Sequence, residues 1–356
     1  MNIEIQINNR VIGVNHPTYF IADIAANHDG HLDRAIELIE MCAEAGADAA
    51  KFQNFSAETI VSDRGFRDLK EGLSHQAKWS ESVYEVYKRA ELPLEWAAAL
   101  REACDRVGID YFTAPYDLEF VSELSEQVVA WKIGSGDITW HELIDKVSRD
   151  KKPVFLATGA SSFDEVKLAV DIVHGHCGDL VLMQCNTNYT GDLENFRHVS
   201  LNVLKTYARA FPKSVLGLSD HTPGSSCVLG AVALGARAVE KHFTDDVGRA
   251  GPDHAFSMTP STWKEMVDRT RELELALGSE DKAVMENEKE TAIVQRRALR
   301  SAREIRTGEQ IGEEDIVPLR PCPRDGLAPY RQDELVGKII KRDLIPGQAF
   351  VESDLF

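Results

Sequence analysis

Two histidines in the second half of the chain have the type and spacing of a metal-binding pair. His221 follows the apolar run 215–218, His242 follows the run 236–239, and 21 residues separate the two imidazoles. Each run has the length of a buried parallel strand, and the small residues of 225–235 between them fit a helix that crosses back over a sheet. Adjacent parallel strands would present both imidazoles at one edge, where α/β enzymes build their sites. A lone histidine is usually structural, but two at neighbouring strand ends indicate a metal site.

Two lysines occupy the same kind of position and supply positive charge. Lys51 lies inside the apolar run 49–53 and Lys132 inside the run 130–133. A surface lysine keeps its ammonium group in water above an apolar stem, but a position within a buried strand does not favour this. Ammonium groups in a dry pocket bind phosphate and carboxylate groups. We therefore expect both lysines to bind an anionic substrate.

One pattern repeats from Thr18 onward: an apolar run, a polar tip and an amphipathic helical stretch. Helix spacing is clear in 32–43, before Gly46, and in 94–107, before Gly108. The apolar runs are 19–24, 49–53, 111–113, 130–133, 154–158, 180–185, 215–218 and 236–239. Eight such units predict an α/β fold of the (β/α)8 TIM-barrel class.

The end of the chain has a different character. Short β-like segments such as 338–340 alternate there with turn signals that contain glycine. We expect a barrel domain at 1–280, a linker at 281–295 and a small β-rich domain at 296–356.

Two segments of the barrel domain depart from the plain repeat. Residues 1–15 are expected to form a hairpin that closes the bottom of the barrel. Residues 62–91, which include Trp79, Tyr84 and Tyr87, are expected to form an elaborated loop over the barrel mouth.

The composition describes a globular, acidic chain. Its 356 residues are 43% hydrophobic, which is enough for one large core and a small second domain. The formal net charge of −18 argues against nucleic acid as a partner, because that binding depends on lysine and arginine. We find no apolar run of about 18 residues and no signal-peptide pattern, so we expect a cytoplasmic protein without a membrane partner.

The cysteines show no spacing typical of zinc ribbons or redox pairs, and they are Cys42, Cys104, Cys177, Cys185, Cys227 and Cys322. Reduced thiols in an intracellular chain fit this pattern. Cys185 falls inside a predicted strand, so it could lie near the site, but it is interpreted as a buried thiol without a role there.

Several short motifs occur in one order along the chain: 21–28 (IADIAANH), 45–53 (AGADAAKFQ), 132–137 (KIGSGD), 217–222 (GLSDHT), 240–244 (EKHFT) and 251–254 (GPDH). Together they resemble the motifs of the sialic acid synthases, the family of N-acetylneuraminate and other nonulosonic acid synthases. The resemblance covers nearly the whole chain, because 296–356 resembles the antifreeze-like (SAF) domain that follows the barrel in that family.

The resemblance implies a transferase that condenses phosphoenolpyruvate with an N-acetylmannosamine-type aldose. The products would be a nine-carbon 2-keto-3-deoxy acid and phosphate. Family members are similar in using a divalent metal, most commonly Mn²⁺, with Mg²⁺ or Co²⁺ as alternatives. They also form homodimers in which the small domain of one chain caps the barrel of the other.

Six residues are expected to be catalytic by this resemblance: Asp23, Lys51, Lys132, Asp137, His221 and His242. The two histidines would be the metal ligands. Asp23 and Asp137 stand where the family more usually has glutamate, so a carboxylate remains but reaches less far. Asp23 could bind metal-bound water or a sugar hydroxyl, and Asp137 could bind a sugar hydroxyl. Either could instead orient another ligand. Which carboxylate acts as general base stays open.

A second group of residues is expected to bind the substrates: Asn27, Gln53, Thr113, Ser135, Thr158, Asn186, Thr187, Tyr189, Ser219, Asp253 and Arg320. Arg320 matches the family arginine that reaches across the dimer to the acceptor's N-acyl group, and Arg324 competes for that role. Phe256 and Met258 could pack on the sugar or in the core.

The choice of acceptor is the main open question. The family's usual Ser-Thr-Gly is Ala157-Thr158-Gly159 here. This change admits other sugars, such as the 2,4-diacetamido-trideoxy hexoses used for legionaminic or pseudaminic acid. Two further alternatives are a synthase acting on a phosphorylated aldose and a carbohydrate-binding barrel without catalysis.

Overall fold

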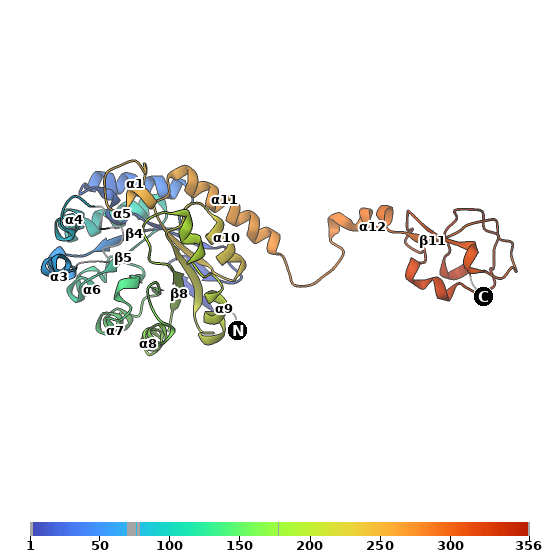
Figure 1. The fold of residues 1–356 in the computed structure, drawn as a ribbon, viewed down its shortest axis with the longest axis horizontal. Helices are drawn as coiled ribbons and strands as arrows, with labels where there is room; N and C mark the ends of the chain where they lie inside the picture. The colour runs from blue at the N-terminus through green and yellow to red at the C-terminus, as the bar shows by residue number, and fades with distance from the viewer. Residues whose placement is uncertain (1–2, 70–75, 77–78, 177, 355–356) are drawn as a thin grey trace. The chain divides into compact units, whose positions relative to one another are not determined.

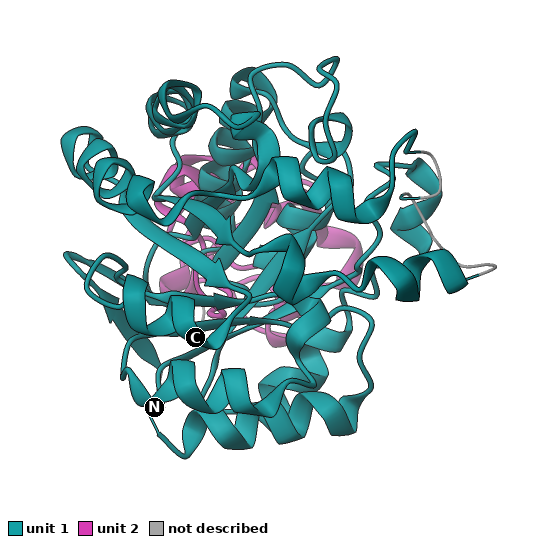
Figure 2. Ribbon diagram, turned by 90° about the vertical axis from the view of Figure 1, so that its left-hand side faces the viewer, with its two compact units in different colours: residues 1–278 teal, residues 279–356 magenta. Residues whose placement is uncertain are grey.

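The computed structural model describes residues 3–69, 76, 79–176 and 178–354. Cys177 and part of the expected insertion at 62–91 lie outside these ranges. The chain forms two compact units, Met1–Gly278 and Ser279–Phe356, which are coloured separately in Figure 2.

Eight parallel strands close into a barrel in the first unit (Figure 1). Their order around the ring is β10-β3-β4-β5-β6-β7-β8-β9, so each strand pairs with its neighbour in sequence and the last closes on the first. The strands are β3 (Tyr19–Asp23), β4 (Ala49–Asn54), β5 (Asp110–Pro115), β6 (Trp131–Ile133), β7 (Val154–Ala157), β8 (Leu180–Cys185), β9 (Val215–Asp220) and β10 (Ala238–His242). The predicted (β/α)8 barrel is confirmed.

The apolar runs mark the strands because both faces of a barrel sheet are covered. Every residue of β5, β8, β9 and β10 is buried. β10 begins at Ala238, later than the run 236–239 predicted, and ends at His242. His242 is therefore the last residue of its strand, whereas His221 follows β9 directly.

Alternate residues of each strand point into the barrel. Near its base Phe112 stacks on Phe155 with ring centroids 5.2 Å apart, and Tyr19 stacks on Phe155 at 6.2 Å. Because the side-chain period of a strand is two, Asp23 lies on the same inner face as Tyr19. The inner side chains at the carboxyl ends of the strands therefore meet above this aromatic layer.

Helices surround the barrel (Figure 1). They are α1 (Leu32–Glu44), α5 (Ala97–Val107), α6 (Leu118–Leu124), α7 (His141–Arg149), α8 (Phe163–His174), α9 (Val203–Ala210), α10 (Ser226–Ala233) and α11 (Pro260–Leu277). Ser162 and Glu165 form a capping box at the start of α8. Gly108 ends α5 in the left-handed conformation, with φ 76°.

A hairpin lies at the amino-terminal end of the barrel strands, as predicted for the start of the chain. β1 (Glu4–Ile7) and β2 (Arg10–Gly13) are antiparallel, and their inner side chains join the barrel core. Asn8 between them donates to Asp110 at the start of β5, at 2.6 Å. Tyr19 donates to the same carboxylate at 2.7 Å.

The described part of the 62–91 insertion contributes two short helices, α3 (Asp63–Asp68) and α4 (Val83–Ala90). α2 (Ala57–Ile60) precedes them directly after β4. Ser82 caps α4 by accepting from the backbone N–H of Glu85. The buried face of α4 carries Val83 and Val86.

The second unit has its own small core. It contains α12 (Lys289–Gln295) and the antiparallel pair β11 (Ala298–Ser301) and β12 (Ile316–Leu319). Its buried side chains are Leu299, Ile305, Ile311, Ile316, Leu327, Leu335, Ile340, Leu344 and Phe350. This agrees with the predicted β-rich domain. Within the described ranges, none of the helices has both the length and the apolar character needed to cross a bilayer.

Candidate active site

Charged side chains from five strand ends form one group, called here the strand-end cluster. Its members are Asp23, Lys51, Lys132, His221, Glu240 and His242, and all six are buried. The parallel register sets Asp23 beside Lys51 on one side and beside His242 on the other. Buried charges are tolerated only where they pair or meet a ligand, so this end of the barrel is built for charged partners.

Lys51 is held between two carboxylates. Its Nζ lies 2.6 Å from Asp23 Oδ2 and 3.7 Å from Glu240 Oε1. Burial lowers the pKa of Lys51, but the two carboxylates outweigh this effect and the net shift is upward. Lys51 therefore keeps its positive charge.

Lys132 is less well compensated. Its Nζ lies 3.6 Å from Glu240 Oε1 and donates to the carbonyl of Ile133 at 3.0 Å. Burial lowers the pKa of Lys132, Glu240 opposes the shift, and the charge of Lys51 adds to it. A bound anion would favour the charged form of Lys132.

Two carboxylate oxygens in the cluster lack partners. Ser219 donates to Glu240 Oε1 at 3.2 Å. Among the described residues, however, nothing hydrogen-bonds to the buried atoms Glu240 Oε2 and Asp23 Oδ1. Buried polar atoms are nearly always satisfied, so these two oxygens mark a place for water or a ligand.

The two imidazoles are neighbours, with ring centroids 5.5 Å apart. His221 Nδ1 lies 3.1 Å from the carbonyl oxygen of Asn186, which favours the proton on Nδ1 and a lone pair on Nε2. His242 Nδ1 is buried and finds no hydrogen-bond partner in the described structure. Burial, aided by His221 and Lys51, lowers the pKa of His242 well below its ordinary value. His242 is therefore neutral, the form of imidazole that binds metals.

This pair fits a divalent ion with two imidazole ligands. Over the described ranges, no group of three or more His, Cys, Asp or Glu side chains is arranged to hold an ion. The remaining ligands would thus be water or substrate oxygens, a mixed set that suits Mn²⁺ and similar ions. Asp23 Oδ2, 3.5 Å from His242 Nε2, is close enough to orient that imidazole.

A group of small polar atoms lies at the ends of β6, β7 and β8. The backbone N–H of Gly159 donates to Ser135 Oγ at 3.0 Å, and Thr187 Oγ1 lies 3.8 Å from Cys185 Sγ. A Cβ atom on Gly159 would stand 1.8 Å from Thr187 Oγ1. The glycine therefore allows both hydroxyl groups to approach the backbone, an arrangement suited to binding an oxyanion.

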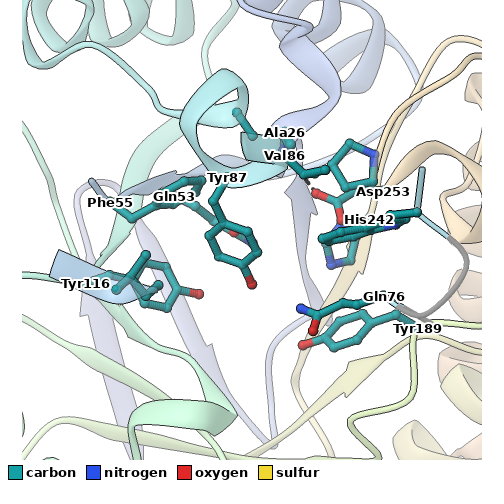
Figure 3. A pocket seen from close by; sticks show the side chains of 14 residues that line it. Ala26, Gln53, Phe55, Gln76, Val86, Tyr87, Tyr116, Tyr189, His242 and Asp253 are labelled. Carbon is teal, nitrogen blue, oxygen red and sulfur yellow. Dashed lines mark hydrogen bonds between the residues drawn. The ribbon is translucent and has the colours of Figure 1, made fainter. Parts of the chain in front are cut away.

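A cavity of ≈150 Å³ opens beside His242 (Figure 3). Phe55, Tyr87 and Tyr116 lie on one side of it, and Tyr189, His242 and Asp253 lie on the other. The further lining residues are Ala26, Gln53, Ile60, Gln76, Trp79, Val86, Ala90 and Pro252. α2 and α4 contribute to its apolar wall, so the insertion after β4 borders the site.

Two carboxylates near the cluster are unusually weak acids. Burial raises the pKa of Asp253 to about 6, although the backbone N–H of Ala26 donates to it at 3.1 Å. Burial also raises the pKa of Asp137 to about 6, against the opposing charge of Lys132. Both groups change protonation near neutral pH, as is common in active sites.

Three predicted substrate-binding residues, Thr113, Thr158 and Asn27, hydrogen-bond to parts of the fold outside the strand-end cluster. Thr113 lies on the opposite strand face from Phe112, and its hydroxyl bonds to Phe52 O (2.9 Å) and Asn54 Oδ1 (2.7 Å). Thr158 turns toward α9, donating to Met183 O and accepting from Tyr207. The reason is strand alternation, which places the neighbours Phe112 and Ala157 inward instead.

Asn27 is the third of these residues, and the role of Arg320 stays a prediction. Asn27 is fully buried and ties its loop to the end of β10, donating to Phe243 O at 2.9 Å and Ser257 Oγ at 3.0 Å. Arg320 belongs to the second unit, which is compact by itself. Met258 is buried in the barrel core, whereas Phe256 reaches the site with its ring centroid 4.9 Å from that of His242.

Two features of the site were not predicted from the sequence, the role of Glu240 and the aromatic wall. Glu240 begins the EKHFT motif but was not assigned a role, although its position two residues before His242 on a strand gives it the same inward face. Cys185 is buried, as predicted, and its Sγ lies 4.0 Å from His221 Nδ1. The aromatic wall from Phe55 and Tyr116 carried no recognisable spacing in the sequence.

Comparisons with known proteins find relatives over most of the chain. The NeuB family model matches residues 38–282, and the SAF domain model matches residues 296–355. An N,N'-diacetyllegionaminic acid synthase of Legionella pneumophila is 35% identical over 92% of this chain and 92% of its own. A pseudaminic acid synthase of Campylobacter jejuni is 32% identical over 94% of this chain and 96% of its own.

A solved structure is similar over most of its length. The crystal structure of an N-acetylneuraminic acid (sialic acid) synthetase from Leptospira borgpetersenii in complex with citrate matches with a TM-score of 0.71 and 29% identity. The match covers 82% of this chain and 95% of that one. The chain therefore belongs to the NeuB family of phosphoenolpyruvate-dependent nonulosonic acid synthases, transferases that act on an acetamido sugar and generally use a divalent metal, and it carries a C-terminal SAF domain.

Proposed function

We propose that the enzyme condenses phosphoenolpyruvate with an N-acetylmannosamine-type aldose, giving a nine-carbon 2-keto-3-deoxy acid and phosphate. The observation that carries this proposal is the strand-end cluster, in which two ammonium groups and two imidazoles share one end of the barrel. Such a site can hold an enol phosphate and an aldehyde side by side.

Phosphoenolpyruvate is proposed to bind to Lys51 and Lys132. The upward pKa shift of Lys51 keeps it positively charged, and the only partly compensated burial of Lys132 favours an added anion. The hydroxyls of Ser135 and Thr187, close to Gly159, are proposed to donate to the phosphate or carboxylate. Asn186 and Ser219, at the ends of β8 and β9, are assigned to the same substrate.

The acceptor sugar is proposed to occupy the cavity beside His242. Gln53, Tyr189 and Asp253 line it, and Asp137 is proposed to bind a sugar hydroxyl. His221 and His242 would hold the divalent ion, proposed to be Mn²⁺, which when bound polarises the aldehyde as a Lewis acid. Asp23, held by Lys51 and Gln53, is proposed to orient His242.

The chemistry forms one carbon–carbon bond and breaks one carbon–oxygen bond. The methylene carbon of phosphoenolpyruvate attacks the aldehyde carbon, whose oxygen becomes a hydroxyl on taking up a proton. Water then adds to the former enol carbon and gives one proton to a carboxylate. Phosphate leaves with its bridging oxygen and takes the remaining proton of the added hydroxyl, which gives the ketone. Asp23 and Glu240, each with an unsatisfied oxygen, are the candidates for that base.

A 2,4-diacetamido-trideoxy hexose is the second candidate acceptor. Phe55, Ile60, Val86 and Ala90 give one side of the cavity apolar side chains. These side chains can pack against acetamido methyl groups and a 6-methyl group. The relatives named as legionaminic and pseudaminic acid synthases lend support to this candidate.

Phosphate release from phosphoenolpyruvate tests both candidates. The assay would contain Mn²⁺ and, separately, N-acetylmannosamine, a 2,4-diacetamido-trideoxy hexose and N-acetylmannosamine 6-phosphate. We expect release that depends on an unphosphorylated acetamido sugar. Release with the phosphorylated sugar alone would contradict the proposal and favour the phosphorylated-aldose alternative.

A further inference from the structure

A buried ion pair lies directly behind the two histidines, on the outer face of the barrel wall. Lys241 Nζ lies 2.5 Å from Asp220 Oδ2 and donates to the carbonyl of Thr222 at 2.5 Å. Lys241 and Asp220 are 2% and 3% exposed. They face each other in the register between β9 and β10.

This pair does not belong to the strand-end cluster. Glu240 and His242 point into the barrel, so Lys241 between them points outward, toward the helices. None of the hydrogen bonds described for Asp220 and Lys241 reaches Asp23, Lys51 or Lys132. The catalytic proposal above leaves both residues without a role.

The contacts of the pair enclose the backbone of His221. Asp220 precedes this histidine, Thr222 follows it, and the Asp220 carboxylate accepts from both the backbone N–H (3.1 Å) and the hydroxyl (2.9 Å) of Thr222. Lys241 then binds the Thr222 carbonyl from the neighbouring strand. The turn that carries His221 is thus fastened at both ends to the residue that precedes His242.

We propose that Asp220, Thr222 and Lys241 are positioning residues that hold His221 and His242 at the separation needed to share a divalent ion. Two imidazoles give few protein ligands, so affinity depends strongly on their being held in place before the ion binds. A buried ion pair contributes little net stability compared with apolar side chains of similar volume. The geometry of the ion pair instead supports a role in orienting the two strand ends.

Mn²⁺ binding to the full-length apoprotein, measured by titration calorimetry, tests this inference, which rests on the proposed metal site. The double variant Asp220→Asn/Lys241→Met removes both charges without leaving one buried alone. We expect its dissociation constant for Mn²⁺ to rise at least about 10-fold, the usual effect of losing the groups that orient metal ligands. Its circular dichroism spectrum should match that of the wild type.

Tyr19→Phe is the matched control. It removes another buried hydrogen bond, to Asp110, at the opposite end of the same barrel. We expect this variant to bind Mn²⁺ as the wild type does, even if its melting temperature falls. A 10-fold loss of Mn²⁺ affinity in the control as well would show that any destabilisation of the barrel weakens binding. That result would overturn the inference.

The remaining outcomes are also decisive. A folded double variant with wild-type affinity would overturn the positioning role. If the double variant does not fold, Thr222→Val replaces it, because this variant keeps both charges but loses the hydroxyl bond to Asp220. We expect Thr222→Val to weaken Mn²⁺ binding about threefold. Wild-type affinity in that variant would overturn the inference. Absence of Mn²⁺ binding by the wild type, or unchanged binding by His242→Ala, would instead refute the proposed metal site itself.

Discussion

At the residue scale, the close approach of Gly159 to Thr187 leads to a first prediction. A methyl group at position 159 would stand 1.8 Å from Thr187 Oγ1 and 3.1 Å from Cys185 Sγ. Gly159→Ala must therefore displace Thr187, at a cost of about 1–3 kcal/mol for overpacking. We expect a lower melting temperature and a KM for phosphoenolpyruvate raised about 10-fold.

The double variant Gly159→Ala/Thr187→Ala separates the two effects. Removing the hydroxyl relieves the overlap, so the melting temperature should recover most of its loss. The raised KM should persist, because Thr187 is proposed to bind the substrate. Full recovery of both quantities would argue against that role.

A second prediction concerns pH and His28, which is 1% exposed. Burial lowers the pKa of His28 to about 4 from the ordinary 6.5. Between pH 4 and pH 6.5 the unfolded chain therefore binds more protons than the folded chain. The free energy of unfolding thus falls as the pH falls from 6.5 to 4. The pKa shift of His28 corresponds to a loss of about 3 kcal/mol in the free energy of unfolding.

Urea unfolding followed by tryptophan fluorescence measures this effect in the barrel, because all five tryptophans lie in the first unit. We expect His28→Gln to lose clearly less stability than the wild type between pH 7 and pH 4.5. Equal losses of stability in the wild type and in His28→Gln would show that His28 does not cause the pH dependence.

At the scale of elements, α4 provides the third prediction. Tyr87 lines the cavity and lies against Phe55, with ring centroids 5.4 Å apart. Tyr87→Ala should raise the KM for the acceptor sugar about 10-fold, because Tyr87 lines the cavity in which the sugar is proposed to bind. The KM for phosphoenolpyruvate should change less than twofold.

Tyr84→Ala on the same helix is the control, since Tyr84 does not line that cavity. We expect it to leave both constants close to the wild-type values. Equal effects of the two variants would show that α4 acts through its fold and not through contact with the sugar.

The strands and their order were predictable from the sequence because barrel strands are buried on both faces and read as continuous apolar runs. Strand alternation also accounts for what was missed. Lys51 and His242, which the motifs predict to meet at the strand ends, both lie in the strand-end cluster, whereas Thr113 and Thr158 lie on the opposite strand face from their neighbours Phe112 and Ala157. The role of Glu240 depends on contacts with lysines from two other strands, which no local pattern reveals.

At the scale of the whole molecule, the proposed homodimer gives the fourth prediction. If the second unit of one chain completes the barrel site of its partner, Arg320→Ala should raise the acceptor KM, whereas Arg324→Ala should not. Co-expressing Arg320→Ala with His242→Ala should then restore activity, because one site of the mixed dimer has both an intact barrel and an intact cap. An absence of restored activity in isolated mixed dimers would contradict capping in trans.

The central claim is that imidazoles and ammonium groups at one end of the barrel bind the metal and phosphoenolpyruvate side by side. A crystal grown with Mn²⁺ and phosphoenolpyruvate, with the metal located by its anomalous scattering, tests this most directly. The account predicts an ion bound by His221 and His242, with the phosphate and carboxylate of phosphoenolpyruvate against Lys51 and Lys132. An ion bound elsewhere, or phosphoenolpyruvate bound away from both lysines, would contradict it.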